Sequence, residues 1–458
     1  MPAFEVLIRG GTVVDGTGSA PRTADVAIAG DRIAEVGALE PNDAARVVDA
    51  DGAVVMPGFV DIHTHYDGQV TWDDRIVPSA WHGVTTVVMG NCGVGFAPCR
   101  PEDRDRLIEL MEGVEDIPGT ALHEGLPWAW ESFAEYLDFL GGRRFDVDVA
   151  AQVPHGAVRL FVMGERGARR EPATADDIAA MGRIVRDGVA AGALGFTTSR
   201  TTNHRTSRGE PTPTLTAAGD ELIGIATVMA EAGGVIEVVS DFRDLDTEFG
   251  IMRGMVEASG RPMSISVAVE EHRASWGSLR DRIVAAADDG LPIKGQVAAR
   301  AIGLVLGLQA TVNPFIGCPS YREIAREPLD VRVRALRDPA FRERLLTEMR
   351  ERGGGFATDF ERIFELGDPP DYEPDASKSV AARAAREGRD PAELVLDLLV
   401  ADDGKGFLYF PLFNWVNGSL DAIGTMLADE HLLPGLADGG AHAGTICDAS
   451  FPTTLLTH

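Results

Sequence analysis

The chain is poor in cysteine and has no long hydrophobic run. Its four cysteines, Cys92, Cys99, Cys318 and Cys447, are too few and too scattered among 458 residues for a disulfide framework. No stretch of about 18 consecutive apolar residues occurs. The N-terminal MPAFEVLIRGG lacks the basic segment and apolar stretch of a secretory signal. We therefore expect a cytoplasmic protein without a membrane span.

Positive charge is also scarce, which bears on the class of partner. The sequence has 71 acidic against 42 basic side chains, a formal net charge of −29. Nucleic acids and anionic membranes bind surfaces of positive charge. We therefore expect neither a nucleic-acid partner nor a membrane partner. The acidity itself is typical of a highly soluble protein.

Two kinds of pattern divide the chain near residue 57. Residues 1–56 contain short β-branched runs separated by Gly-Gly, Asp-Gly and Gly-Asp turns, which predict hairpins and a small N-terminal sheet. In residues 57–458, strand-like and helix-like stretches alternate, as in a parallel sheet with crossover helices. Eight or nine such strands favour an α/β fold of the (β/α)8 TIM-barrel type over an open sheet.

Apolar runs define the predicted strands of this barrel. They are residues 59–62, 85–89, 147–152, 194–197, 235–239, 264–269, 311–313, 407–410 and 433–437, with amphipathic helices predicted at 175–191, 217–232 and 278–287. A charged, helix-rich segment from about 318 to 402 is predicted to be a helical insertion late in the barrel. The chain ends soon after the last predicted strand, so we expect a C-terminus that is truncated relative to a complete barrel enzyme.

The most informative motif is Asp61-Ile62-His63-Thr64-His65, directly after the first predicted barrel strand. Side chains alternate along a strand, so both imidazoles point to one face. Two neutral imidazoles at the carboxyl end of a barrel strand form half of a metal site, and that end carries the active site in such barrels. The alternative is a structural pair of histidines. The position in the chain favours metal binding.

The segment from Asp25 to Asp67 resembles the entry segment of the amidohydrolase superfamily, in which a sandwich piece precedes a metal-bearing barrel. GVTTVVMGNCGVGFAP, residues 83–98, is similar to the D-aminoacylase (N-acyl-D-amino-acid deacylase) branch. In that branch the cysteine after the second strand is a metal ligand, which implies this role for Cys92. The resemblance extends, with gaps, from about residue 4 to the end of the chain.

Chemistry also supports metal ligation by Cys92, because thiolates bind zinc strongly. The alternative for this residue is a small buried hydrophobe. LADGGAH, residues 436–442, is similar to the last-strand motif of the family, which implies that Asp438 binds metal and acts as the general base. A plain Asp-Gly-Gly turn is the alternative. The predicted ligands are thus His63, His65, Cys92 and Asp438, holding one Zn²⁺ ion.

Three further residues are predicted to bind substrate. His155 lies in a His-Gly-x-x-Arg segment that resembles one in this branch, with a satisfied core histidine as the alternative. Arg200 follows the fourth strand, and its guanidinium is suited to hold the carboxylate of an N-acyl amino acid. The alternative for Arg200 is a surface ion pair. Tyr66, next to the histidine pair, is predicted to lie beside the ligands.

The sequence departs from the family at the next two strands. The resemblance implies two further histidine ligands at the ends of the fifth and sixth strands, where this chain has valines near Val239 and Val267. Glu237 and Glu270 are carboxylate alternatives, and His272 lies several residues too late. A second metal position is therefore not expected.

These observations predict a metal-dependent hydrolase of non-peptide C–N bonds, acting on small N-acyl-D-amino acids or related N-acyl compounds through a metal-activated water. Two alternatives stay open. One is a cyclic-amide hydrolase of the hydantoinase or dihydropyrimidinase kind, which shares the entry segment but not the Gly-Asn-Cys-Gly motif. The other is a non-catalytic barrel that binds a small molecule at a decayed metal site.

Overall fold

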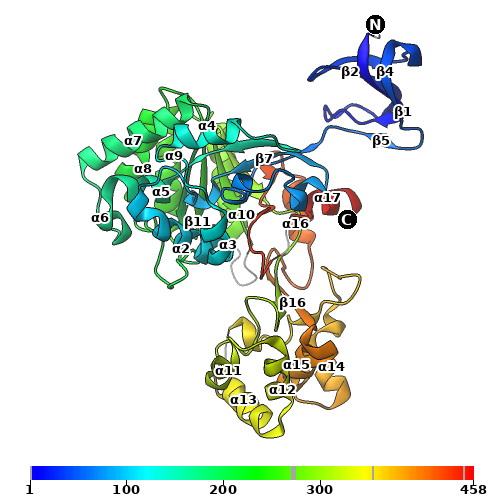
Figure 1. The fold of residues 1–458 in the computed structure, drawn as a ribbon, viewed down its shortest axis with the longest axis vertical. Helices are drawn as coiled ribbons and strands as arrows, with labels where there is room; N and C mark the ends of the chain where they lie inside the picture. The colour runs from blue at the N-terminus through cyan, green and yellow to red at the C-terminus, as the bar shows by residue number, and fades with distance from the viewer. Residues whose placement is uncertain (1–2, 270–274, 353–354, 447–448) are drawn as a thin grey trace. The chain divides into compact units, whose positions relative to one another are not determined.

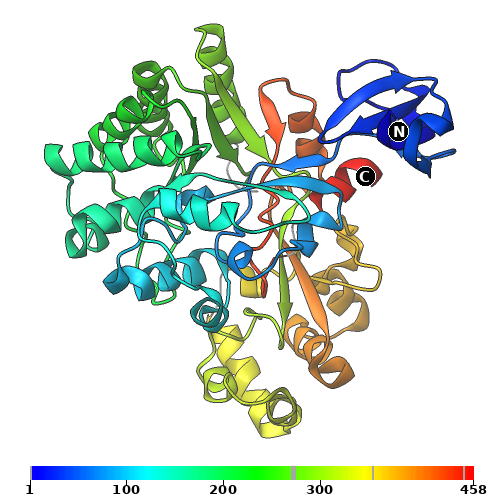
Figure 2. The ribbon, with the colours of Figure 1, turned by 45° about the horizontal axis from the view of Figure 1, so that its top comes forward.

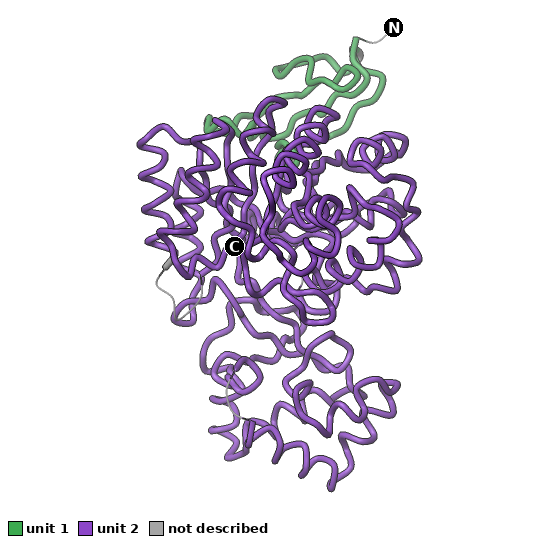
Figure 3. The backbone as a smooth tube through the Cα atoms, turned by 90° about the vertical axis from the view of Figure 1, so that its left-hand side faces the viewer, with its two compact units in different colours: residues 1–59 green, residues 60–458 purple. Residues whose placement is uncertain are grey.

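The computed structural model describes residues 3–269, 275–352, 355–446 and 449–458. The chain divides into two compact units, residues 1–59 and residues 60–458 (Figure 3). Glu270, His272 and Cys447 lie outside the described residues. None of the described helices combines the length and apolar character that a membrane span needs.

Unit 1 is a five-stranded sheet with the order β3-β2-β1-β4, and β5 also pairs with β1. The strands are β1 (Phe4–Val13), β2 (Arg22–Ala29), β3 (Arg32–Gly37), β4 (Ala44–Asp49) and β5 (Val54–Val55). The ladder between β1 and β2 shifts register between Ile8 and Gly11. Glycine is required at position 11 because a Cβ atom there would lie 2.5 Å from Cγ2 of Val55.

A ring of strands forms the centre of unit 2 (Figure 2). In chain order these are β6 (Phe59–Asp61), β7 (Val84–Met89), β8 (Asp148–Ala151) with β9 (Val153–Pro154), β10 (Gly195–Arg200), β11 (Val235–Ser240), β12 (Met263–Val267), β13 (Ile293–Val297) and β17 (Leu432–Pro434). Parallel ladders join β7 to β8 and run from β9 through β10, β11, β12 and β13 to β17. A parallel bridge between Thr64 and Gly439 connects the segments that follow the first and last strands. This arrangement is a (β/α)8 barrel.

Helices cover the outside of the ring (Figure 1). They are α1 (Val77–Ala80), α2 (Arg104–Glu115), α3 (Gly119–Gly125), α4 (Phe133–Gly141), α5 (His155–Met163), α6 (Glu165–Ala168), α7 (Ala175–Ala190), α8 (Gly219–Met229), α9 (Leu245–Ser259), α10 (Ser275–Asp288), α16 (Asp421–Leu427) and α17 (Phe451–Thr457). Helix α7 shows why they form. Thr174 and Asp177 make a reciprocal capping box at its start, and Met181, Val185 and Val189 bury one face.

The late part of the barrel differs from the sequence prediction. The seventh barrel strand is β13, which was not predicted because IKGQV mixes Lys294 and Gln296 into a short strand. Residues 311–313, predicted as a strand, form no regular secondary structure. Residues 407–410 do form a strand, β16 (Phe407–Phe413), but it pairs antiparallel with β14 (Ile302–Gly307), outside the ring.

Strands β14 and β16 bracket a helical excursion with a core of its own. Its elements are α11 (Pro319–Ile324), α12 (Leu329–Arg337), α13 (Pro339–Arg352), β15 (Phe364–Glu365), α14 (Val380–Glu387) and α15 (Pro391–Val400). Phe315, Leu336, Leu345 and Leu399 are fully buried within it. The first helix of the excursion begins at Pro319, and β14 and β16 pair at its base.

A buried ionic network ties α5 to α8 within the barrel unit. Glu221 accepts hydrogen bonds from Nε of Arg159 at 2.8 Å and from the His155 ring at 3.0 Å. All three side chains are buried. Burial alone would raise the pKa of Glu221, but the contacts with His155 and Arg159 outweigh it and lower the pKa to about 2. Glu221 is therefore ionised, and its charge balances that of Arg159.

Removing this carboxylate charge should destabilise the barrel. We expect Glu221→Gln to lower the free energy of unfolding by about 3–5 kcal/mol, because Arg159 would keep a buried charge without a counter-ion. Equilibrium urea unfolding at neutral pH, followed by far-UV circular dichroism, measures the change. Asp220→Asn, at the exposed neighbouring position, is the control and should cost less than about 1 kcal/mol. Equal effects of the two substitutions would contradict the assignment.

Candidate metal centre

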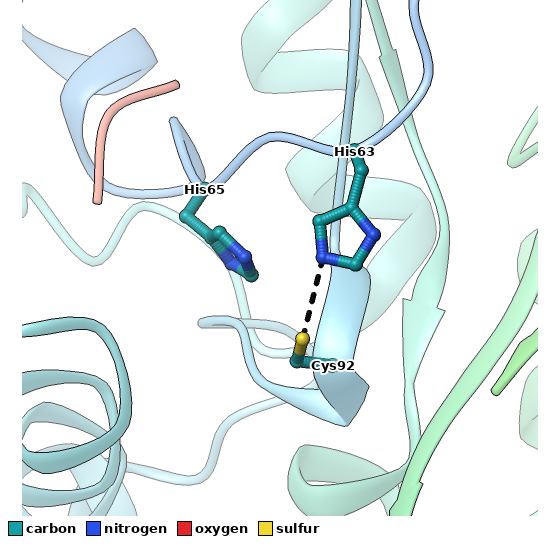
Figure 4. A group of neighbouring side chains, drawn as sticks. All are labelled: His63, His65 and Cys92. Carbon is teal, nitrogen blue, oxygen red and sulfur yellow. Dashed lines mark hydrogen bonds between the residues drawn. The ribbon is translucent and has the colours of Figure 1, made fainter. Parts of the chain in front are cut away.

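His63 and His65 follow β6 at the seam where the first and last barrel strands meet. The amide of His65 donates to Gly439 O at 2.8 Å, and the amide of Asp438 donates to His63 O at 3.1 Å. These main-chain bonds fix the two histidines against the loop that carries Asp438. Both imidazoles are buried, and Figure 4 shows their rings directed toward Cys92.

Cys92 lies in a tight turn after β7. Gly90 has φ 86°, and a Cβ atom there would lie 2.2 Å from Gln152 O, so the turn requires glycine. Cys92 itself adopts φ 54°, an uncommon conformation for a residue with a side chain. Its Sγ lies 3.3 Å from Nε2 of His63. One donor atom from each of His63, His65 and Cys92 lies within 4.8 Å of the others.

The turn is held in place by two hydrogen-bonded side chains. Asn91 donates through Nδ2 to Val88 O at 2.8 Å and to Thr64 O at 3.2 Å. The amide of Cys92 donates to Oε2 of Glu237 at 3.3 Å. Oε1 of Glu237 also lies 3.9 Å from Nδ1 of His63, so this side chain of the fifth strand contacts both the cysteine turn and the first histidine.

Asp438 completes this group from the loop after β17. Its Oδ1 lies 3.5 Å from Nε2 of His63 and 3.6 Å from Nε2 of His65. The side chain is 14% exposed, so it also reaches the cavity. The structure therefore brings together His63, His65, Cys92 and Asp438, the four side chains predicted as ligands.

Two more donors lie at the same place. Oε2 of Glu115, at the end of α2, lies 3.3 Å from Nε2 of His65 and 3.6 Å from Nε2 of His442. His442 Nε2 is also 4.0 Å from Oδ2 of Asp438. Glu115 is 2% exposed. Glu115 was not among the predicted ligands, because a glutamate at the end of a helix carries no distinctive signal, and no role was predicted for His442 within its motif.

A cavity of about 300 Å³ opens at this cluster. Its wall includes His63, His65, Cys92, Glu115, Asp438 and His442 on one side. Apolar side chains form much of the rest, including Val239, Phe242, Leu245, Leu279 and Phe413. The described residues that line it include no Lys or Arg.

Burial dominates the electrostatics of the acidic groups. It raises the pKa of Glu237 to about 8 and that of Asp67 to about 7. It also raises the pKa of the Cys92 thiol and of Glu115, and neighbouring carboxylates raise both further. With no Lys or Arg in the described lining, these groups lack a protein cation that would stabilise their anionic forms.

Burial has the opposite effect on the histidines, because it disfavours the imidazolium. It lowers the pKa of His63 to about 4 and lowers that of His65 as well. The imidazoles are therefore neutral, the form that binds metal. Burial would raise the pKa of Asp438, but the surrounding imidazoles outweigh it and hold that pKa well below its usual range.

This donor set fits a divalent metal ion. Two neutral imidazoles, a thiol and two carboxylates converge, and a dication supplies the positive charge that the described lining lacks. A mixed set of nitrogen, sulfur and oxygen donors suits zinc better than magnesium. Gln296 sets the orientation of His63: its Oε1 lies 3.1 Å from Nδ1 of that ring, while its Nε2 donates to Ser264 Oγ at 2.6 Å. His63 thus carries its proton on Nδ1 and presents Nε2 to the cluster.

The residues predicted to bind substrate lie elsewhere. Arg200 pairs with Glu248 through two hydrogen bonds, at 2.6 and 2.8 Å, and its guanidinium does not line the cavity. His155 belongs to the buried network with Glu221. Tyr66 is fully buried and its hydroxyl lies 2.7 Å from Ser79 Oγ. None of the three belongs to the lining of this cavity.

The family model for the amidohydrolase family matches residues 46–458. The chain belongs to the amidohydrolase family. It is 32% identical over 270 residues to a D-aminoacylase of Alcaligenes xylosoxydans xylosoxydans, an alignment that covers 59% of this chain and 51% of the relative. The chain thus spans about half the length of this curated relative.

Two solved structures share the fold of this chain. A D-aminoacylase structure has a TM-score of 0.57 at 25% identity, and the match covers 95% of this chain and 76% of the other. The N-acyl-D-glutamate deacylase of Bordetella bronchiseptica, solved with zinc and a phosphonate inhibitor, has a TM-score of 0.59 at 22% identity over 94% of this amidohydrolase and 75% of that chain. The barrel predicted from the sequence is therefore confirmed.

The role of Gln296 can be tested by metal affinity. We expect Gln296→Leu to weaken zinc binding by about 10- to 100-fold, because the Nδ1–H of His63 would lose its acceptor and the ring its orientation. Competition with a chromophoric chelator measures the dissociation constant. Gln69→Leu, which removes a hydrogen bond to Asp73 and none to a proposed ligand, is the control. An unchanged dissociation constant in Gln296→Leu would show that His63 is oriented by other contacts.

Proposed function

We propose that this amidohydrolase is a zinc-dependent hydrolase of non-peptide C–N bonds that deacylates N-acyl-D-amino acids or related small N-acyl compounds. The observation that carries the proposal is the convergence of His63, His65, Cys92 and Asp438 on one cavity. The similarity to D-aminoacylase supports the substrate class. One zinc ion, held by these four side chains, is part of the proposal.

The proposed chemistry follows from the position of each group. Zinc held by these side chains would supply Lewis-acid chemistry, activating water for attack and polarising the acyl oxygen of the substrate. Asp438 accepts the proton of the attacking water and donates it to the departing nitrogen. His63 and His65 are neutral because they are buried. The negative charge of the centre therefore comes from the Cys92 thiolate and the Asp438 carboxylate. Gln296 holds the ring of His63 in the orientation that this requires.

The cavity also suggests how the substrate lies. Phe242, Leu245 and Leu279 form an apolar wall suited to an acyl chain or an apolar side chain. Arg200 was predicted to hold the substrate carboxylate, but its guanidinium is engaged by Glu248. Binding of the substrate carboxylate by Arg200 stays part of the proposal, and it requires the ion pair between Arg200 and Glu248 to open.

The architecture and the location of the protein belong to the same proposal. Residues 1–56 are taken as part of a β-sandwich domain, and residues 57–458 as the barrel with its helical insertion. We place the enzyme in the cytoplasm with a small-molecule substrate and without nucleic-acid or membrane partners. The low positive charge supports the absence of nucleic-acid and membrane partners.

Metal content is the first test. We expect about one zinc per chain in protein purified without chelators, and loss of that zinc in Cys92→Ala, because the thiolate is the strongest zinc ligand of the set. Elemental analysis of both proteins measures it, and hydrolysis of N-acetyl-D-amino acids should disappear with the metal. Cys99→Ala removes another buried thiol and should keep the zinc. A folded wild-type protein without metal would overturn the proposal.

The general-base role of Asp438 makes a separate kinetic prediction. We expect Asp438→Asn to lower kcat by about 10²- to 10⁴-fold, because an amide cannot accept the proton of the attacking water. Steady-state kinetics on the zinc-loaded variant give kcat, and the metal content of the same sample shows that the loss is not one of zinc alone. Asp421→Asn, at an exposed site, is the control. Full kcat in zinc-loaded Asp438→Asn would exclude the role.

A further inference from the structure

The carboxylate of Glu115 is buried at the metal centre, and its hydrogen bonds do not account for its position there. Among the described residues, its Oε1 has no hydrogen-bond partner, and neither ring nitrogen of the adjacent His65 has one. Oε2 nevertheless lies 3.3 Å from Nε2 of His65 and 3.6 Å from Nε2 of His442. These groups are close together and yet are not hydrogen-bonded.

The separations match those between ligands of one metal ion. Around one zinc ion with bonds of about 2.0–2.2 Å to nitrogen and oxygen, neighbouring donor atoms lie about 2.8–3.6 Å apart, depending on the number of ligands. The contact between Glu115 and His65 has this length, as do those of Asp438 with His63 and His65. The contact between Glu115 and His442 also falls in this range.

Which ring nitrogen of His65 the Glu115 carboxylate faces shows whether Glu115 could bind the metal itself or only orient the histidine. A side chain that orients a metal-bound histidine contacts the ring nitrogen that does not bind the metal, as Gln296 does at Nδ1 of His63. Glu115 instead faces Nε2 of His65, the same atom that faces Oδ1 of Asp438. Its carboxylate therefore lies on the side of the ring where the metal belongs.

The chain holds Glu115 and His442 together through its backbone. The amide of His442 donates to Glu115 O at 2.5 Å. Asp116, at φ 50°, turns away from α2, and its carboxylate accepts hydrogen bonds from Gly444 N at 3.2 Å and from the hydroxyl of Thr445. These contacts fasten the end of α2 to the loop after β17. Two donors that are 327 positions apart in the sequence are thereby fixed side by side.

We infer that Glu115 is a metal ligand, and that with His442 it completes the centre on the side of His65. Val239 and Val267, on the fifth and sixth strands, offer no donor there. The centre then combines imidazole, thiolate and carboxylate donors, with Glu115 supplied by the end of α2. This assignment rests on the metal site of the proposed function.

The test compares zinc affinity in five proteins: wild type, Glu115→Gln, His442→Gln, Gln296→Leu and Glu124→Gln. Glu115→Gln keeps the shape of the side chain and removes its charge, so zinc affinity should fall by more than the about 10- to 100-fold expected for an outer partner such as Gln296. Glu124, exposed on α3, should leave affinity unchanged. His442→Gln should also weaken binding. Circular dichroism and urea unfolding of the metal-free proteins verify that each variant folds.

Cobalt supplies an independent readout. In Co²⁺-substituted Glu115→Gln, the thiolate-to-metal charge-transfer band from Cys92 should persist, while the d–d bands shift because an oxygen ligand has changed. Wild-type zinc affinity in Glu115→Gln, or a loss no greater than that in Gln296→Leu with unchanged d–d bands, would overturn the ligand assignment and leave the proposed function standing. A wild-type protein that binds neither metal would overturn both.

Discussion

The closure of the barrel between its first and last strands is the constraint on which the site depends. The parallel bridge from Thr64 to Gly439, with the main-chain hydrogen bonds around it, joins a segment near the start of the barrel sequence to one near its end. The side chains next to this bridge are His63, His65 and Asp438. A barrel that failed to close would separate the two imidazoles from the carboxylate and leave each without its partners. Closure of the fold and assembly of the site are thus the same event.

Burial gives this cluster its chemical character. The low-dielectric surroundings keep the imidazoles neutral and disfavour the anionic forms of the thiol and the carboxylates. Elsewhere in the same unit, Glu221 is equally buried, but Arg159 balances its charge. The difference between the two places is the cation. At the barrel seam the described lining offers none, and a bound dication would stabilise the thiolate and carboxylates that would hold it.

Side chains from several strands hold the proposed metal ligands in position through hydrogen bonds. Gln296 from β13 fixes the ring of His63, Glu237 from β11 holds the amide of Cys92, and Asn91 ties the turn after β7 to the first strand. The end of α2 adds Glu115, held to the last loop through its carbonyl. These contacts span more than 350 positions of sequence, and each fixes one donor of the centre.

The sequence by itself determined the alternation of strands and helices, the barrel, and the motifs with His63, His65, Cys92 and Asp438, because strand periodicity and short motifs are local properties. It did not reveal β13, whose polar residues hide a barrel strand, nor the pairing of residues 407–410 outside the ring. Only the tertiary structure decided that Glu115 and His442 lie beside His65, and that Arg200 and His155 are occupied by Glu248 and Glu221. The physical reason is that such contacts arise from strand closure and from helix ends meeting distant loops. No local pattern of residues encodes them.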